Sequence, residues 1–126
     1  MWWLAVLITI VLAIIGYAIY YARNSPYRIP AKDARQRIAA GAVDVVLDVR
    51  TQMERDKFGL YEGSIHLPAD HIHAHMPTLY PNKDTRIIVY CNTGQRARLA
   101  TEILRAIGYE QAFYISEGHW ALTPKK

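Results

Sequence analysis

The chain has 126 residues, and its composition divides it into two unequal parts. Residues 1–22 contain 20 of the 65 hydrophobic residues and no charged side chain, whereas residues 23–126 contain all 15 basic and all 11 acidic residues. The length fits one domain, the single cysteine excludes an intrachain disulfide scaffold, and the local nature of the basic excess argues against nucleic-acid binding.

The uncharged segment, residues 1–22, predicts a transmembrane helix. At about 1.5 Å per residue it would span roughly 33 Å, enough to cross a hydrocarbon core of about 30 Å. Tryptophans lie near its start and tyrosines near its end, which is typical of helices that leave a bilayer at both interfaces. A cleaved signal peptide is the alternative, but no Lys or Arg precedes the apolar run, and the run is too long.

A basic segment follows the apolar one. Five basic residues and one acidic residue lie between Arg23 and Arg37, and this excess equals the whole net charge of +4. The positive-inside rule therefore predicts a single-pass inner-membrane protein with its C-terminal part in the cytoplasm, the periplasm being the alternative. We expect residues 23–28 to form a basic linker and residues 29–124 to form the domain.

Strand and helix patterns alternate along the rest of the chain, which predicts an α/β fold with a central parallel sheet flanked by helices. The strands are expected at 43–49, 64–67, 86–90 and 112–115, and the helices at 30–40, 51–59, 70–75 and 95–107. Thr51 and Glu54 have the spacing of a capping box. Asp70 is expected to cap the third helix, and Pro77 to open a further turn.

The most informative segment is a buried strand, a short loop beginning at Cys91, and a helix. Open α/β sheets place their sites at the carboxyl ends of strands, and the N-terminus of the following helix stabilises an anion there. Such a position favours the thiolate, the nucleophilic form of cysteine. Gly94 allows a tight loop, and Arg96 supplies a fixed cation. The alternative, a buried structural cysteine that ends a strand, does not account for this combination of residues.

Three motifs occur in order along the chain. They are Asp48-Val-Arg50, the segment from Gly63 to Pro68 (GSIHLP), and the segment from Ile87 to Arg96 (IIVYCNTGQR). Together they resemble the signatures of single-domain rhodanese-like proteins, the thiosulfate sulfurtransferase family, over residues 29 to 122.

This resemblance implies a sulfurtransferase that needs no cofactor or metal. Cys91 would take sulfane sulfur from a donor such as thiosulfate as a persulfide, and pass it to a thiol or cyanide acceptor. The loop Asn92, Thr93, Gly94, Gln95 and Arg96 would bind the substrate, with its backbone N–H groups around the persulfide and Arg96 on the donor's anionic end. Asp48 and Arg50 would be a supporting ion pair. The oligomeric state stays open.

Two other functions are alternatives to this one. Related phosphatases need five residues between the cysteine and the arginine, whereas this loop has four, so a phosphate should fit poorly. A catalytically weak, membrane-tethered module for sulfur relay or binding is the alternative from a different class.

Three alternating histidines, His71, His73 and His75, would share a face on a strand and could then bind a metal. On the predicted helical turn they diverge, which favours a solvated polar surface.

Overall fold

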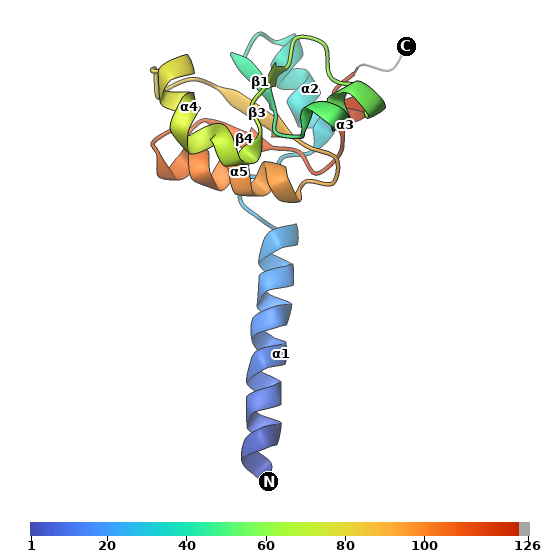
Figure 1. Ribbon diagram of the computed structural model, residues 1–126, viewed down its shortest axis with the longest axis vertical. Coiled ribbons are helices and arrows are strands. Elements are labelled where there is room, and N and C mark those ends of the chain that lie inside the picture. Colours follow the sequence, from blue (N-terminus) through green and yellow to red (C-terminus); the bar gives the residue numbers. More distant parts are fainter. Residues whose placement is uncertain (124–126) are drawn as a thin grey trace.

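Figure 1 shows a computed structural model of the chain, which describes residues 1–123. Helix α1 (Trp2–Arg23) projects from an α/β domain that contains the rest of the described chain. The stretch Trp2–Tyr21 is long and apolar enough to cross a membrane, and no part of it is buried against the domain. The length and composition of α1 thus agree with the predicted anchor.

The domain is built on a four-stranded, fully parallel sheet in the order β2-β1-β3-β4. The strands are β1 (Val45–Asp48), β2 (Ile65–His66), β3 (Ile87–Tyr90) and β4 (Ala112–Tyr114). The helices are α2 (Ala31–Ala39), α3 (Gln52–Phe58), α4 (Ile72–Leu79) and α5 (Gln95–Ala106), with 3-10 turns η1 (Ala69–His71) and η2 (His119–Ala121). This architecture confirms the predicted fold class.

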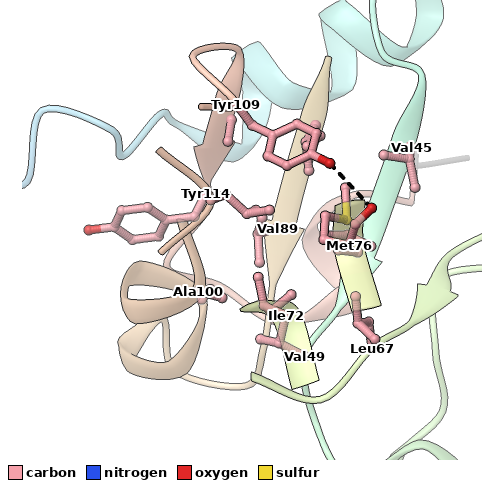
Figure 2. Packing of buried hydrophobic residues seen from close by; sticks show 14 of the residues in the cluster. Val45, Val49, Leu67, Ile72, Met76, Val89, Ala100, Tyr109 and Tyr114 are labelled. Carbon is pink, nitrogen blue, oxygen red and sulfur yellow. Dashed lines mark hydrogen bonds between the residues drawn. The ribbon is translucent and has the colours of Figure 1, made fainter. Parts of the chain in front are cut away.

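Alternation along the central strands divides the core into two layers. Val45, Leu47, Ile87 and Val89 face α4 and α5, and Figure 2 shows part of this cluster, including the Tyr109 hydroxyl that donates to the Met76 carbonyl over 3.2 Å. Val46, Ile88 and Tyr90 face the opposite way, toward α2. Burial on both faces explains why these strands are continuous apolar runs.

The predicted linker lies against the edge of the sheet. Ile29 donates its N–H to the Tyr114 carbonyl over 2.9 Å, Tyr114 donates to the Tyr27 carbonyl over 3.0 Å, and Arg28 forms a parallel bridge with Tyr114. The segment that leaves α1 therefore covers the outer edge of β4 before the chain enters α2. The predicted end of the domain, residue 124, lies outside the described residues.

The structure corrects the region before β3. Asp70 caps no helix, because it lies within η1 and its side chain makes no capping hydrogen bond. Pro77 opens no new turn, because it lies inside α4. Pro77 has no N–H, so the only helical hydrogen bond lost is the one to the carbonyl of His73. His73 is exposed to water.

Candidate active site

Cys91 follows β3 directly and lies on the side of the sheet that faces α5. Its side chain is fully buried, and the Gly94 N–H donates to its Sγ over 3.0 Å. Gly94 is the N-cap of α5, so the first turn of this 12-residue helix begins at the loop. The amide and the positive end of the helix dipole both favour negative charge on the sulfur.

The loop owes its shape to a close approach of two backbones. Gly94 has φ +95°, and a Cβ added there would lie 2.8 Å from the Cα of Ser116. Glycine is therefore required at this position for two reasons, the left-handed backbone conformation and the close contact with Ser116. Ser116 lies two residues beyond β4, so the last strand fixes the position of the loop that follows β3.

On the opposite side of the sheet, Asp48 and Arg50 form a buried ion pair. Arg50 donates from Nε to Oδ1 of Asp48 over 3.0 Å and from Nη2 to Oδ2 over 2.8 Å, and both side chains are fully buried. The Asp48 carboxylate also accepts from Arg55 at 2.9 Å and from the Tyr90 hydroxyl at 2.8 Å. Burial would raise the pKa of Asp48, but the hydrogen bonds from Arg50 and Tyr90 outweigh burial and lower it.

This ion pair is connected to the cysteine loop. Arg50 Nη1 donates to Oδ1 of Asn92 over 3.2 Å, and Nη2 donates to the Gly59 carbonyl over 2.7 Å. His66 Nε2 donates to the Arg50 carbonyl over 2.6 Å. The predicted supporting pair therefore contacts the first residue after Cys91 through the guanidinium group.

A second carboxylate, Glu54, binds the loop from α3. It accepts two hydrogen bonds from the Arg96 guanidinium, at 2.6 and 2.7 Å, and one from the Asn92 amide at 2.6 Å. Glu54 also completes the predicted capping box with Thr51, which fixes its rotamer. The cation expected to face an anionic donor is thus already paired with a carboxylate.

The Glu54–Arg96 pair predicts a specific pH dependence of stability. The Arg96 hydrogen bonds lower the pKa of Glu54 from 4.5 to about 2. Because the pKa is lowered in the folded state, the ion pair contributes fully to the free energy of unfolding above about pH 4.5. This contribution is lost as the pH falls toward about 2. In urea unfolding of the full chain in a neutral detergent, the free-energy difference between wild type and Glu54→Gln should shrink over that interval.

The exposed Asp44 provides the control for this experiment, because its pKa is also lowered to about 2, by Arg86. In a chain that carries Asp44→Asn, the effect of Glu54→Gln on the free energy of unfolding should depend on pH as it does in the wild-type chain. A difference between wild type and Glu54→Gln that is constant from pH 5 to pH 2 would contradict the assignment.

A hollow of about 310 Å³ opens beside the loop. It is lined by Phe58, Asn92, Gly118, His119 and Trp120, and both Phe58 and Trp120 are largely exposed. His119 Nε2 donates to the Phe58 carbonyl over 2.9 Å, which joins the C-terminal segment to the end of α3. An apolar surface therefore borders one side of the cysteine loop.

The structure brings most of the predicted site residues together. Asn92, Gly94 and Arg96 make the contacts described above, whereas Thr93 and Gln95 lie on the exposed side of the loop. Sequence reasoning missed Arg55 and Tyr90, and it recognised Glu54 only as a capping residue. The capping box was the signal that could have placed Glu54 at the site, because it puts Glu54 at the start of the helix after β1. Since β1 and β3 are neighbours, that helix begins beside the loop that follows β3.

The alternating histidines take no part in the hydrogen bonds described above. His71 and His75 have ring centroids 5.5 Å apart. Within residues 1–123, no group of three histidine, cysteine or acidic side chains is arranged to hold a metal ion.

Fold and site together define a parallel α/β protein with a buried cysteine between its central strand and a helix N-terminus. The sequence model of the Rhodanese-like domain matches residues 30–122. The chain therefore belongs to the rhodanese family.

Individual relatives differ in how they are named. The chain is 35% identical over 48 residues to thiosulfate sulfurtransferase PspE of Escherichia coli, which covers 38% of this chain and 46% of that protein. It is 30% identical over 107 residues to the adenylyltransferase and sulfurtransferase uba4 of Ogataea parapolymorpha, a match that covers 82% of this chain and 27% of that protein. A tRNA uridine(34) hydroxylase of Cronobacter sakazakii is 30% identical over 78 residues, covering 59% and 22%. The chain thus matches between about a fifth and a half of these curated relatives.

Solved structures share the fold. The human single-domain sulfurtransferase TSTD1 superposes with a TM-score of 0.65 at 21% identity, over 80% of this chain and all of that chain. A rhodanese-related protein from Thermoplasma volcanium superposes with a TM-score of 0.62 at 28% identity, over 75% and 88%.

Proposed function

We propose that this protein is a membrane-anchored sulfurtransferase that carries sulfane sulfur on Cys91. The observation that supports the proposal best is the position of the Cys91 Sγ, which accepts the Gly94 N–H at the N-terminus of α5. An anion-stabilising environment around a single sulfur suits a nucleophile that must be a thiolate before and after each transfer. The rhodanese family and the sulfurtransferase relatives support the same reaction class.

The proposed reaction has two displacements. The Cys91 thiolate attacks the outer sulfur of a donor such as thiosulfate, an S–S bond to Sγ forms, and sulfite leaves with the electron pair of the broken S–S bond. A thiol or cyanide acceptor then attacks the same outer sulfur, and Cys91 leaves as a thiolate. The described chain offers no second cysteine, so the acceptor is an external molecule.

In this reaction the loop residues Asn92 to Arg96 surround the transferred sulfur and bind the donor. Arg96 would then have to exchange its hydrogen bonds with Glu54 for contacts with the donor's anionic end. Asp48 and Arg50 position the loop through Asn92 and do not touch the substrate.

A second candidate function is a sulfur-relay or binding module with little turnover of small donors. The pairing of Arg96 with Glu54 and the complete burial of Cys91 favour it, because both restrict access by thiosulfate. The two functions differ in whether thiosulfate alone loads the cysteine.

We also propose that residues 1–22 anchor the protein in the membrane, with residues 23–28 as the basic linker and residues 29–124 as the domain. The basic residues that follow α1 favour the cytoplasmic side. A reporter fused after Lys126 that is active only outside the cytoplasm would contradict this orientation.

The proposal is tested by mass spectrometry of the full chain in a neutral detergent after incubation with thiosulfate. The expected result is a mass gain of one sulfur on Cys91, which cyanide removes and Cys91→Ser never acquires. Loading only by a protein persulfide donor would support the relay function. No adduct from any donor on demonstrably reduced Cys91 would refute sulfur transfer.

A further inference from the structure

A second hollow, of about 200 Å³, lies between the membrane-proximal segment and the cysteine loop. It is lined by Arg23, Arg28, Thr93, Gly94, Gln95, Tyr114 and Ser116. Arg23 is the last residue of α1, and Thr93 to Gln95 belong to the loop that begins at Cys91. The hollow therefore joins the exit of the apolar helix to the candidate active site, and Figure 1 shows α1 ending beneath α5.

The charges around this hollow favour an anion. Two arginines line it and no acidic side chain does. In the described part of the chain neither Arg23 nor Arg28 forms an ion pair. Glu117 borders an adjoining hollow together with Arg28, and Glu102, which acts on Tyr114, is paired with Arg98 at 3.0 Å. The first turn of α5 adds N–H groups that have no acceptor within the helix.

Tyr114 provides an independent indication of a ligand. Its side chain is 1% exposed, and its hydroxyl makes no hydrogen bond with any described residue. Figure 2 shows its ring directed away from the rest of the cluster. The Ser25 side chain lies nearby, but its hydroxyl accepts the N–H of Tyr27 at 3.3 Å and forms no hydrogen bond with the Tyr114 hydroxyl. A buried hydroxyl without a partner is costly, and a ligand oxygen in the hollow would satisfy it.

We propose that Arg23, Arg28 and the Tyr114 hydroxyl, with the first turn of α5, bind a tetrahedral oxyanion of the phosphate type. The position of Arg23 favours the headgroup of an anionic phospholipid as its source, because a residue that ends a membrane-spanning helix lies at the level of the headgroups. This choice of source rests on the proposed membrane anchor. A bound headgroup would hold the cysteine loop against the membrane surface.

The test uses the ¹⁵N-labelled full chain in micelles of a neutral detergent and follows the amide signals of Thr93, Gly94 and Gln95. One arm adds phosphatidylglycerol to the micelles, with phosphatidylcholine as the control lipid, and the other arm adds inorganic phosphate. We expect saturable shifts with phosphatidylglycerol. Arg23→Gln and Arg28→Gln should each weaken binding about fivefold or more, and Tyr114→Phe about threefold.

Lys32→Gln is the matched control, because it removes one charge from the same basic segment but does not line the hollow, so it should bind as wild type. Shifts with inorganic phosphate that depend on the same three residues would support the site and assign its ligand to a soluble anion. No saturable shift with either probe would overturn the proposal. The proposal would also be overturned if Arg23→Gln, Arg28→Gln and Lys32→Gln weakened binding equally and Tyr114→Phe had no effect. That pattern would mean that the basic segment attracts anions by its net charge and not through a defined site.

This outcome is separable from the proposed sulfur transfer. Cys91→Ser cannot form a persulfide but should bind phosphatidylglycerol as wild type does. A chain that binds the lipid yet never carries sulfur would refute the proposed function alone, and a chain that carries sulfur without binding either probe would refute the site alone.

Discussion

Replacing Asp48 by alanine should destabilise the domain by about 3–5 kcal/mol, because it leaves the buried Arg50 guanidinium without its carboxylate. Arg50 is fully buried and directs two nitrogens at Asp48. The same substitution removes the acceptor of the Tyr90 hydroxyl. Since a domain of this size is typically stable by only about 5–15 kcal/mol, the loss would be a large part of the total. Urea unfolding of the full chain in neutral detergent, followed by the near-ultraviolet circular dichroism of the buried tyrosines, measures it.

The chain contains a matched exposed pair. Arg86 also contacts Asp44 through two nitrogens, at 3.0 and 2.7 Å, but both side chains are about 40% exposed or more. Asp44→Ala should therefore destabilise the domain much less than Asp48→Ala does. Equal costs for Asp48→Ala and Asp44→Ala would show that burial of the ion pair does not set its contribution.

Replacing Gly94 by alanine should slow the proposed loading of Cys91 with sulfur by about 100-fold, because the new Cβ displaces the loop. Positive φ alone costs an alanine roughly 1–2 kcal/mol. The larger effect comes from the 2.8 Å approach to the Ser116 backbone, which cannot move aside as a flexible side chain would. A shift of about 1 Å in a reacting group is enough for a loss of that size. The initial rate of the one-sulfur mass gain measures it.

Gly63 is the control for this substitution. Its φ is +90°, close to that of Gly94, but a Cβ added there meets nothing within 4 Å. Gly63→Ala should therefore have the same backbone cost without affecting the loading rate by more than about twofold. If the two alanine variants load equally slowly, backbone contact with Ser116 does not position the loop.

The sequence predicted the sheet well because its central strands are buried on both sides. β1 and β3 are continuous apolar runs, and each forms within the range expected for it. The third helix was predicted to end at residue 75, before Pro77, whereas α4 continues to Leu79. An exposed proline removes one backbone hydrogen bond but does not interrupt the burial of Ile72 and Met76 on the other side of the helix. Local signals therefore predicted elements whose pattern is regular and failed where a single residue suggested a boundary.

The candidate site was predictable only in part for a different reason. Cys91 and Gly94 could be recognised from the strand, loop and helix that surround them. The contacts of Arg96 could not be recognised, because its partner Glu54 is 42 positions away and meets it only through the pairing of β1 with β3. Likewise, the Asp48–Arg50 pair was expected, but its link to Asn92 depends on the same strand order.

The hydrogen bonds of residues 27 to 29 with Tyr114 have a practical consequence for work on the isolated domain. A fragment that began at residue 30, where the family match begins, would lose the backbone that occupies the outer edge of β4. An uncovered edge strand recruits strands from other molecules and promotes aggregation. A soluble form of this protein should therefore begin before Ser25, so that every molecule retains the segment that protects its own sheet from its neighbours.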